Sequence, residues 1–281
     1  MKVVILGSAG LLGSESVREW RTAGHAVHPL TRADLDVTRC PDVQKAISAA
    51  SPDVIINCTA YNRVDDAEDH PVDAFAVNAF AVRLLARVAA DIGASFVHYS
   101  TDFVFDGRGA CPYTEADVPN PLSVYGASKL VGEWFAADAP RHYTIRVESL
   151  FGGNTARSSV DRMLDSLRAG RQVVAFTDRT ASPSYVADVT LATRLLVTGG
   201  GQAGLYHCVN TGQTTWMGIA EALRDLLHLQ VAGIVTSRAA EVKMRAARPM
   251  FAALANDKLT SLGIPMPSWQ DALARHVKMR T

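Results

Sequence analysis

The chain has 281 residues, and its 28 Lys and Arg balance its 28 Asp and Glu, so the formal net charge at pH 7 is zero. Balanced charge gives no electrostatic reason to expect nucleic acid or an anionic membrane surface as a partner. No apolar run reaches the ~18 residues of a membrane-spanning helix, so we expect no membrane segment and a cytoplasmic location. The four cysteines are widely spaced, which favours a reducing compartment and predicts no metal site.

Short β-rich runs alternate with longer helical patterns through the first half of the chain. The expected strands are Lys2–Leu6, Ala26–Leu30, Val54–Asn57, Ser95–Ser100 and Tyr143–Val147, and the expected helices are Leu11–Ala23, Pro41–Ala50, Asp73–Ile92 and Ser123–Ala137. Such alternation is typical of βαβ units. The sequence therefore predicts an α/β fold with a Rossmann-type, doubly wound parallel sheet.

The pattern is less regular in the second half. Helices are expected at Val160–Ala169, Val186–Val197, Trp216–Leu227 and Trp269–Val277, and short strands at Gln172–Phe176 and Leu205–Val209. We expect residues 1–150 to form a dinucleotide-binding domain. Residues 151–281 are expected to form mainly a smaller substrate-binding lobe, with some elements returning to the sheet.

A glycine-rich turn follows the first strand, with Gly7, Gly10 and Gly13 spaced as G-x-x-G-x-x-G before a helix. Glycines let the backbone approach a pyrophosphate closely, and the helix N-terminus offers free N–H groups and positive dipole. A tight packing turn is the alternative reading of the same residues. The strand-turn-helix context favours a dinucleotide site.

Arg32 lies just after the second strand, where NAD-preferring domains carry an acidic residue that binds the ribose. A guanidinium there can bind a 2′-phosphate instead. The sequence thus indicates NADPH or NADH as cofactor, with NADPH favoured, although a solvated arginine on an exposed turn fits equally well.

Tyr125 and Lys129 are four residues apart in an expected helix, so both project from one face. A neighbouring ammonium lowers the pKa of a phenol and suits it to acid-base work. The pair alone is common by chance. Ser100 and Thr101 add weight, because they end the fourth strand at the edge where parallel sheets bind ligands.

With these residues in place, the chain resembles the extended short-chain dehydrogenase/reductases, and within them the dTDP-4-dehydrorhamnose reductase family. The resemblance covers nearly the whole length. It rests on segments 7–13, 35–37, 52–57, 65–68, 77–78, 100–107 and 121–129, and in the second half on Asp178, 182–185, 204–207, Trp216, Arg248-Pro249 and Trp269.

The resemblance implies a role for each matched residue. Thr101, Tyr125 and Lys129 would be catalytic; Gly7, Gly10, Leu11, Leu12 and Gly13 would hold the pyrophosphate; Asp36 and Val37 would meet the adenine; Thr59, Ala60 and Tyr61 would line the nicotinamide; and Ser100 and Phe103 would contact substrate with Thr101 and Tyr125. Arg248 is a candidate for the substrate diphosphate, because a guanidinium matches phosphate geometry.

Two positions bear on substrate and assembly. Ser149 stands where the family has a tryptophan facing the sugar, which puts rhamnose as the product in doubt. Glu15 resembles a glutamate of a metal-linked dimer contact, but the sequence offers no convincing partner ligands. A homodimer therefore stays open, and metal is predicted to be absent.

The leading interpretation is an NAD(P)H-dependent reductase of a nucleotide-linked 4-keto-deoxysugar. One alternative is a nucleotide-sugar epimerase or dehydratase, but Asp102 is followed by Phe103 and not by Glu, so an evident acid-base pair is lacking. The other is a non-catalytic cofactor-binding subunit resembling the methionine adenosyltransferase β subunit. The intact Thr101, Tyr125 and Lys129 argue against this alternative.

Overall fold

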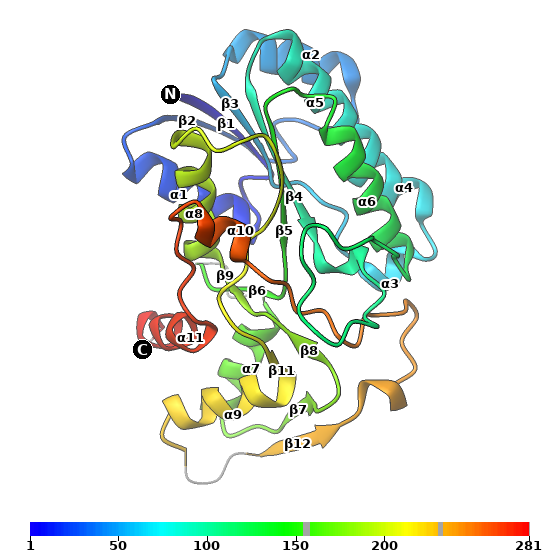
Figure 1. The fold of residues 1–281 in the computed structure, drawn as a ribbon, viewed down its shortest axis with the longest axis vertical. Coiled ribbons are helices and arrows are strands. Elements are labelled where there is room, and N and C mark those ends of the chain that lie inside the picture. Colours follow the sequence, from blue (N-terminus) through cyan, green and yellow to red (C-terminus); the bar gives the residue numbers. More distant parts are fainter. Residues whose placement is uncertain (154–157, 230–232, 281) are drawn as a thin grey trace.

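Six parallel strands form the central sheet of the computed structural model, which describes residues 1–153, 158–229 and 233–280 (Figure 1). Their order across the sheet is β10 (Gly204–His207), β5 (His142–Val147), β4 (Ser95–Thr101), β3 (Val54–Asn57), β1 (Lys2–Leu6) and β2 (Ala26–Leu30). Each neighbouring pair is parallel. The predicted α/β fold class with a doubly wound sheet is confirmed.

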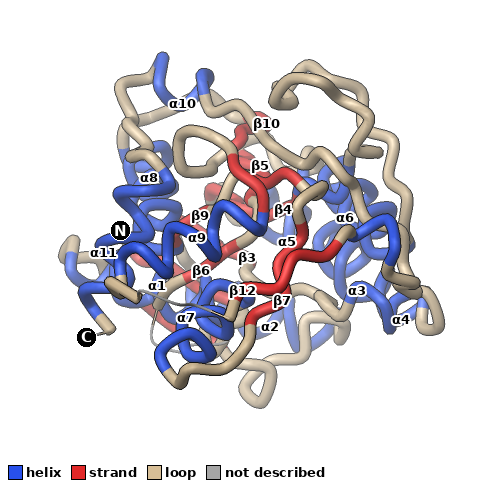
Figure 2. Tube along the Cα trace, turned by 90° about the horizontal axis from the view of Figure 1, so that it is seen from below, coloured by secondary structure: helices blue, strands red, loops and turns tan. Residues whose placement is uncertain are grey.

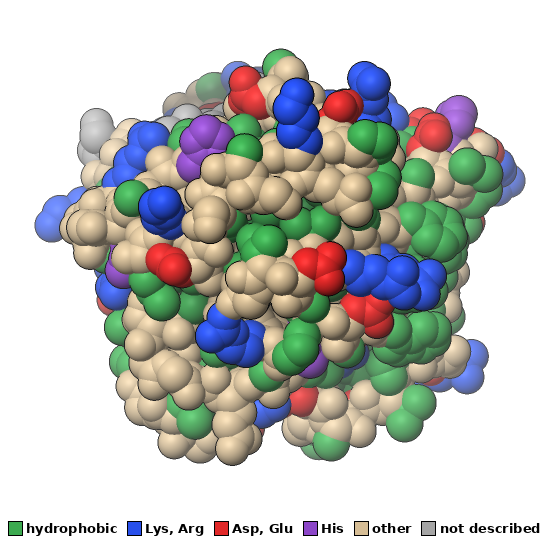
Figure 3. All heavy atoms as spheres, turned by 90° about the horizontal axis from the view of Figure 1, so that it is seen from above, with side chains coloured by type: hydrophobic (Ala, Val, Ile, Leu, Met, Phe, Trp, Pro, Cys, Tyr) green, Lys and Arg blue, Asp and Glu red, His purple; other side chains and the backbone are tan. Residues whose placement is uncertain are grey.

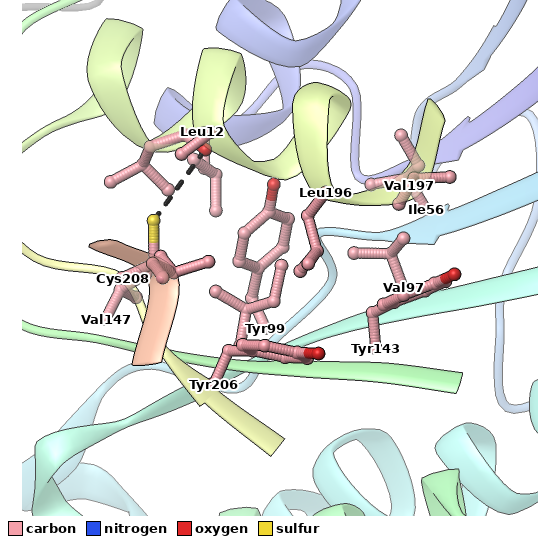
Figure 4. Close-up of a cluster of buried hydrophobic side chains, with 14 of the residues drawn as sticks. Leu12, Ile56, Val97, Tyr99, Tyr143, Val147, Leu196, Val197, Tyr206 and Cys208 are labelled. Atoms are coloured by element: carbon pink, nitrogen blue, oxygen red, sulfur yellow. Dashed lines mark hydrogen bonds between the residues drawn. The ribbon is translucent and has the colours of Figure 1, made fainter. Parts of the chain in front are cut away.

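The two faces of the sheet bury different cores, because successive side chains of a strand point to opposite faces. Val3 and Ile5 of β1 pack with α1 (Leu11–Thr22) and α8 (Val186–Thr198). Val4 and Leu6 face the core built with α2 (Cys40–Ala50), α5 (Ala81–Asp91) and α6 (Val124–Ala136). Figure 4 shows the first core, where Tyr99 points from β4 towards α8 and its hydroxyl donates to Thr193 at 2.9 Å.

The helix expected over Asp73–Ile92 forms as three joined pieces. They are α4 (Pro71–Phe75), the π-helical turn η1 (Ala76–Phe80) and α5, preceded by the short α3 (Val64–Ala67). A π-turn inserts an extra residue without breaking the helix, which a search for regular helical spacing does not detect.

The second lobe lies below the sheet in Figure 1 and in front of it in Figure 2. It contains α7 (Ser159–Arg168), β7 (Val173–Phe176) paired with β12 (Ile234–Ser237), α9 (Trp216–Leu226), α11 (Trp269–Met279), and the pairs β6 (Leu150–Phe151) with β9 (Ser184–Tyr185) and β8 (Thr180–Ala181) with β11 (Thr214–Thr215). The remaining elements are the 3₁₀ turns η2 (Asp102–Val104) and η3 (Ala239–Glu241) and the helix α10 (Asp257–Ser261). Both α8 and β10 return to the sheet layer, and the proposed division at residue 150 stays a prediction.

The molecular surface carries mixed charge. On the face shown in Figure 3, Lys and Arg side chains are interspersed with Asp and Glu side chains. None of the helices in the described part of the chain has the length and apolar character needed to span a bilayer.

Candidate active site

A cavity of about 1140 Å³ opens at the carboxyl edge of the sheet. In the sheet, β2 lies on one side of β1 and β3 lies on the other, so the strand order reverses direction at β1. Doubly wound sheets bind ligands beyond the carboxyl ends of the strands at the point where the strand order reverses. Fifteen predicted residues line the cavity: Gly7, Gly10, Leu11, Leu12, Arg32, Asp36, Val37, Thr59, Ala60, Tyr61, Ser100, Thr101, Phe103, Tyr125 and Lys129. Of the predicted residues, all of which the structure describes, Gly13 and Arg248 lie outside its wall.

The glycine turn fits a pyrophosphate. Gly7 has φ +71°, and a Cβ there would lie 2.9 Å from the carbonyl oxygen of Cys58. A Cβ on Gly13 would lie 2.2 Å from the Gly7 carbonyl oxygen, so Gly13 serves the close packing of α1 under the turn. The first turn of α1 has no acidic residue, and Gly10 at its N-cap makes no side-chain cap. Its free N–H groups are thus available to phosphate oxygens.

The turn after β2 carries the residues predicted to bind the adenosine part of the cofactor. Asp36 accepts hydrogen bonds from the backbone N–H and the hydroxyl of Thr38 at 3.0 and 2.7 Å, and these bonds lower the pKa of its carboxyl. Arg32 is exposed in the cavity wall and lies close enough to Asp36 to lower that pKa further. The carboxylate of Asp36 therefore stays charged beside the guanidinium.

A buried asparagine holds the segment expected to line the nicotinamide. Asn78 accepts a hydrogen bond from the Tyr61 N–H at 2.8 Å, and its amide donates to the Tyr61 carbonyl and the Ser128 hydroxyl at 3.1 and 2.9 Å. Its position in the π-turn lets it join this loop to α6.

Tyr125 and Lys129 project from α6 into the cavity, beside Thr101 at the end of β4. The hydroxyl of Ser123 caps α6 by accepting from the Gly126 N–H at 3.2 Å. A Cβ on Gly126 would lie 2.2 Å from the Phe103 carbonyl oxygen, so this glycine lets the helix approach η2. The structure thus brings together the three residues predicted to be catalytic.

The electrostatics of this group differ from the expectation that Lys129 lowers the pKa of Tyr125. Burial raises the pKa of Tyr125 to about 12, and hydrogen bonding with Thr101 offsets only part of the shift. The Lys129 ammonium donates instead to the Tyr99 carbonyl at 2.5 Å and lies 3.4 Å from His98 Nε2. Burial lowers the pKa of Lys129 to about 8. Tyr125 is therefore held in its protonated form.

Three predicted substrate contacts have partners within the protein, and one of them is Thr101, whose hydroxyl donates to Asp102. The Ser100 hydroxyl donates to the buried Glu133, which also forms a two-point ion pair with Arg146. Arg248 pairs with Asp65. Contact of these three residues with substrate stays a prediction that must compete with these bonds.

Charged residues that sequence reasoning missed lie beside Thr101. Burial raises the pKa of Asp102 to about 6, although its side chain accepts from the Thr101 hydroxyl at 2.9 Å. Burial also raises the pKa of Glu148, which accepts from the Ser182 N–H at 2.6 Å. Arg179 faces both carboxyls and lowers both pKa values. Ser149, the neighbour of Glu148, lines the cavity.

Known proteins share the fold of this chain. The parallel sheet, the glycine turn and the Thr101, Tyr125 and Lys129 group define a Rossmann-type protein of the short-chain dehydrogenase/reductase class, to which the matching family model also assigns the chain. The chain belongs to the dTDP-4-dehydrorhamnose reductase family: the family model described as RmlD substrate binding domain matches residues 1–281. The predicted family is confirmed, and with it the class of NAD(P)-dependent oxidoreductases.

Curated relatives match over nearly their whole length. A dTDP-4-dehydrorhamnose reductase of Burkholderia thailandensis is 34% identical, with 99% of this chain and 98% of the relative covered. A probable dTDP-4,6-dihydroxy-2-methyloxan-3-one 4-ketoreductase of Streptomyces antibioticus is 33% identical, with 97% and 93% covered.

Solved structures of other proteins have the same fold as this chain. The dTDP-4-dehydrorhamnose reductase of Bacillus anthracis in complex with NADP is 30% identical and superposes with a TM-score of 0.94 over 100% of this chain and 99% of that one. A Thermus thermophilus UDP-glucose 4-epimerase is 19% identical with a TM-score of 0.85, covering 99% and 98% of the two chains, and this likeness shows the fold alone.

Proposed function

We propose that this protein reduces the 4-keto group of a nucleotide-linked deoxysugar with NADPH or NADH. The observation that carries the proposal is the placement of Thr101, Tyr125 and Lys129 in one cavity wall with the glycine turn. Relatives named as dTDP-4-dehydrorhamnose reductases and as a 4-ketoreductase support the same reaction. The relative that holds NADP supports the choice of cofactor.

The bound nicotinamide would supply hydride to the keto carbon. In the same step, Tyr125 donates its phenolic proton to the oxygen that becomes the alcohol. Its raised pKa suits this direction, because a phenol that stays protonated is ready to donate. Thr101 orients the keto oxygen, and Lys129 binds the nicotinamide ribose and places positive charge near the phenolate that remains.

The test is the loss of NADPH absorbance with a panel of nucleotide 4-keto sugars. Turnover with at least one of them, yielding the 4-hydroxy product, is expected. An epimerase would instead interconvert sugars without net consumption of NADPH, and a non-catalytic subunit would bind cofactor without turnover. The predicted cytoplasmic location and homodimer belong to this proposal, and sedimentation of the purified protein tests the dimer.

A further inference from the structure

Two residues that line the cavity each carry a side-chain N–H group with no hydrogen-bond acceptor among the described residues. The two groups are Nε of Arg179 and Nε1 of Trp216, and both nitrogens are buried. Folded proteins pair nearly all buried polar groups, so two unpaired donors in one place point to a ligand. In the described chain, one other buried side-chain polar atom, the Thr144 hydroxyl of β5, lacks a partner.

The two residues that carry these donors lie at the junction of two hollows, meaning the stretch of wall that both hollows share. Arg179 and Trp216 line the large cavity and also a second one of about 270 Å³ in the second lobe. Ser159 and Arg162 are shared between the two walls in the same way. A ligand that reaches from the catalytic residues into the smaller hollow would therefore contact side chains of this shared wall.

The junction favours an anion rich in hydrogen-bond acceptors. Trp216 begins α9, while Ser159 begins α7 and Arg162 follows in its first turn, so the N-termini of two helices lie at the junction. Side chains cap both helices, Ser158 and Asp161 at α7 and Thr215 at α9, so the positive charge that an anion would meet there comes mainly from the guanidinium groups of Arg162 and Arg179. Arg162 donates to the Ser159 hydroxyl at 2.8 Å, which holds a guanidinium at the start of α7. Phosphate oxygens accept hydrogen bonds and donate none, so a phosphate group suits a site whose side chains at Arg162, Arg179 and Trp216 are donors.

The Phe103 ring connects the junction to the reacting group. The Arg179 guanidinium lies 5.7 Å from the centre of the Phe103 ring, and that ring meets the Tyr125 ring edge-on with 5.4 Å between centres. The wall beside Tyr125 would hold the keto sugar. Arg179 then lies where a group attached to the far side of that sugar would pass.

We propose that Arg179 and Trp216 bind the diphosphate of the substrate. This proposal rests on the proposed function, because it takes a nucleotide-linked sugar as the ligand. It transfers the diphosphate role from Arg248, which is paired with Asp65, to a guanidinium that no described carboxylate approaches within salt-bridge distance. Asp102 and Glu148 interact with Arg179 at longer range and favour its position in the wall.

The test is calorimetric titration of dTDP into protein saturated with NADPH, so that cofactor phosphates do not compete. Arg179→Gln should weaken dTDP binding roughly 10- to 100-fold, and Trp216→Phe, which keeps a ring but removes the N–H, roughly three- to tenfold. Arg224→Gln removes the same charge from α9 of the second lobe, where Arg224 pairs with Asp225, and should leave binding unchanged. Thymidine, which lacks phosphates, should bind wild type and Arg179→Gln alike.

Each outcome separates the two proposals. Equal dTDP affinity for wild type, Arg179→Gln and Trp216→Phe would overturn the diphosphate assignment while the proposed function stands. Equal losses for dTDP and thymidine would show a damaged lobe and would also overturn the assignment. If wild type binds no nucleoside diphosphate, the proposed function itself fails. With substrate, Arg179→Gln should raise KM more than it lowers kcat.

Discussion

Arg248 forms a two-point ion pair with Asp65, with Nη1 and Nη2 donating to the two carboxylate oxygens at 2.9 and 2.6 Å. The pair joins the segment after η3 to α3, which are far apart in the sequence. The Ala246 N–H donates to the same carboxylate at 3.0 Å. These bonds, with those from Arg248 first, lower the pKa of Asp65 to about 2.

Arg248→Gln should therefore lower stability, and if Arg179 binds the diphosphate, the exchange should change dTDP affinity little. Because half of the Asp65 side chain is exposed, solvent screens the pair and we expect a loss of about 1 kcal/mol or less in urea unfolding near neutral pH. The folded pKa of Asp65 lies below its ordinary value of 3.8, so the contribution is present above that pH and is lost as pH falls towards 2. A large loss of dTDP affinity in this variant would return the diphosphate role to Arg248.

The parts of the site that local spacing determines could be predicted from the sequence. The glycine turn and the Tyr125–Lys129 pair depend on residues close together in the chain, and both lie in the cavity wall. Arg179 and Trp216 reach the same wall through the packing of β8, β11 and α9, which no local pattern encodes. The two-residue strands β6, β8, β9 and β11 are too short to show alternating polarity, so the sequence does not predict them.

Tyr125→Phe removes the hydroxyl and keeps the ring against Phe103. If Tyr125 is the proton donor, kcat should fall about 10² to 10⁴-fold while cofactor affinity changes little. Lys129→Met should reduce turnover and cofactor affinity together, because the lysine is expected to bind the ribose. Single-turnover rates and fluorescence titration with NADPH measure the two effects. Retention of near-wild-type kcat by Tyr125→Phe would refute its assigned role.

The rate of reduction should depend on pH through Lys129. Its pKa is lowered to about 8 by burial, so the ammonium loses its proton as pH rises through that value. Tyr125, with a pKa of about 12, stays protonated over the same range and does not limit the rate. We expect kcat/KM to fall above about pH 8. A profile that stays level well above pH 8 would show that the charge on Lys129 is not needed.

Arg32 should favour NADPH over NADH, because it is exposed in the cavity wall after β2, where a guanidinium can bind the 2′-phosphate. Arg32→Asp should reverse the preference, since a carboxylate repels that phosphate and accepts from the ribose hydroxyl. Fluorescence titration of both cofactors decides the matter. Arg39→Gln is the matched control, because Arg39 is an exposed arginine that pairs with Asp42 at the start of α2. Tighter binding of NADH by the wild type would contradict the prediction.

Ser149 should leave the sugar end of the cavity wider than in the rhamnose-forming enzymes. Its side chain lines the cavity, but a hydroxymethyl group cannot provide the contact area of an indole. We expect a bulkier or differently substituted sugar to give the highest kcat/KM in a panel of nucleotide 4-keto sugars. Ser149→Trp should then depress turnover of that sugar more than turnover of dTDP-4-dehydrorhamnose. Ser149 already has a left-handed backbone conformation with φ +43°. Both Ser149 and its Trp replacement must adopt this conformation, so the exchange tests side-chain size. If dTDP-4-dehydrorhamnose is the best substrate of the wild type, the widened pocket does not set specificity.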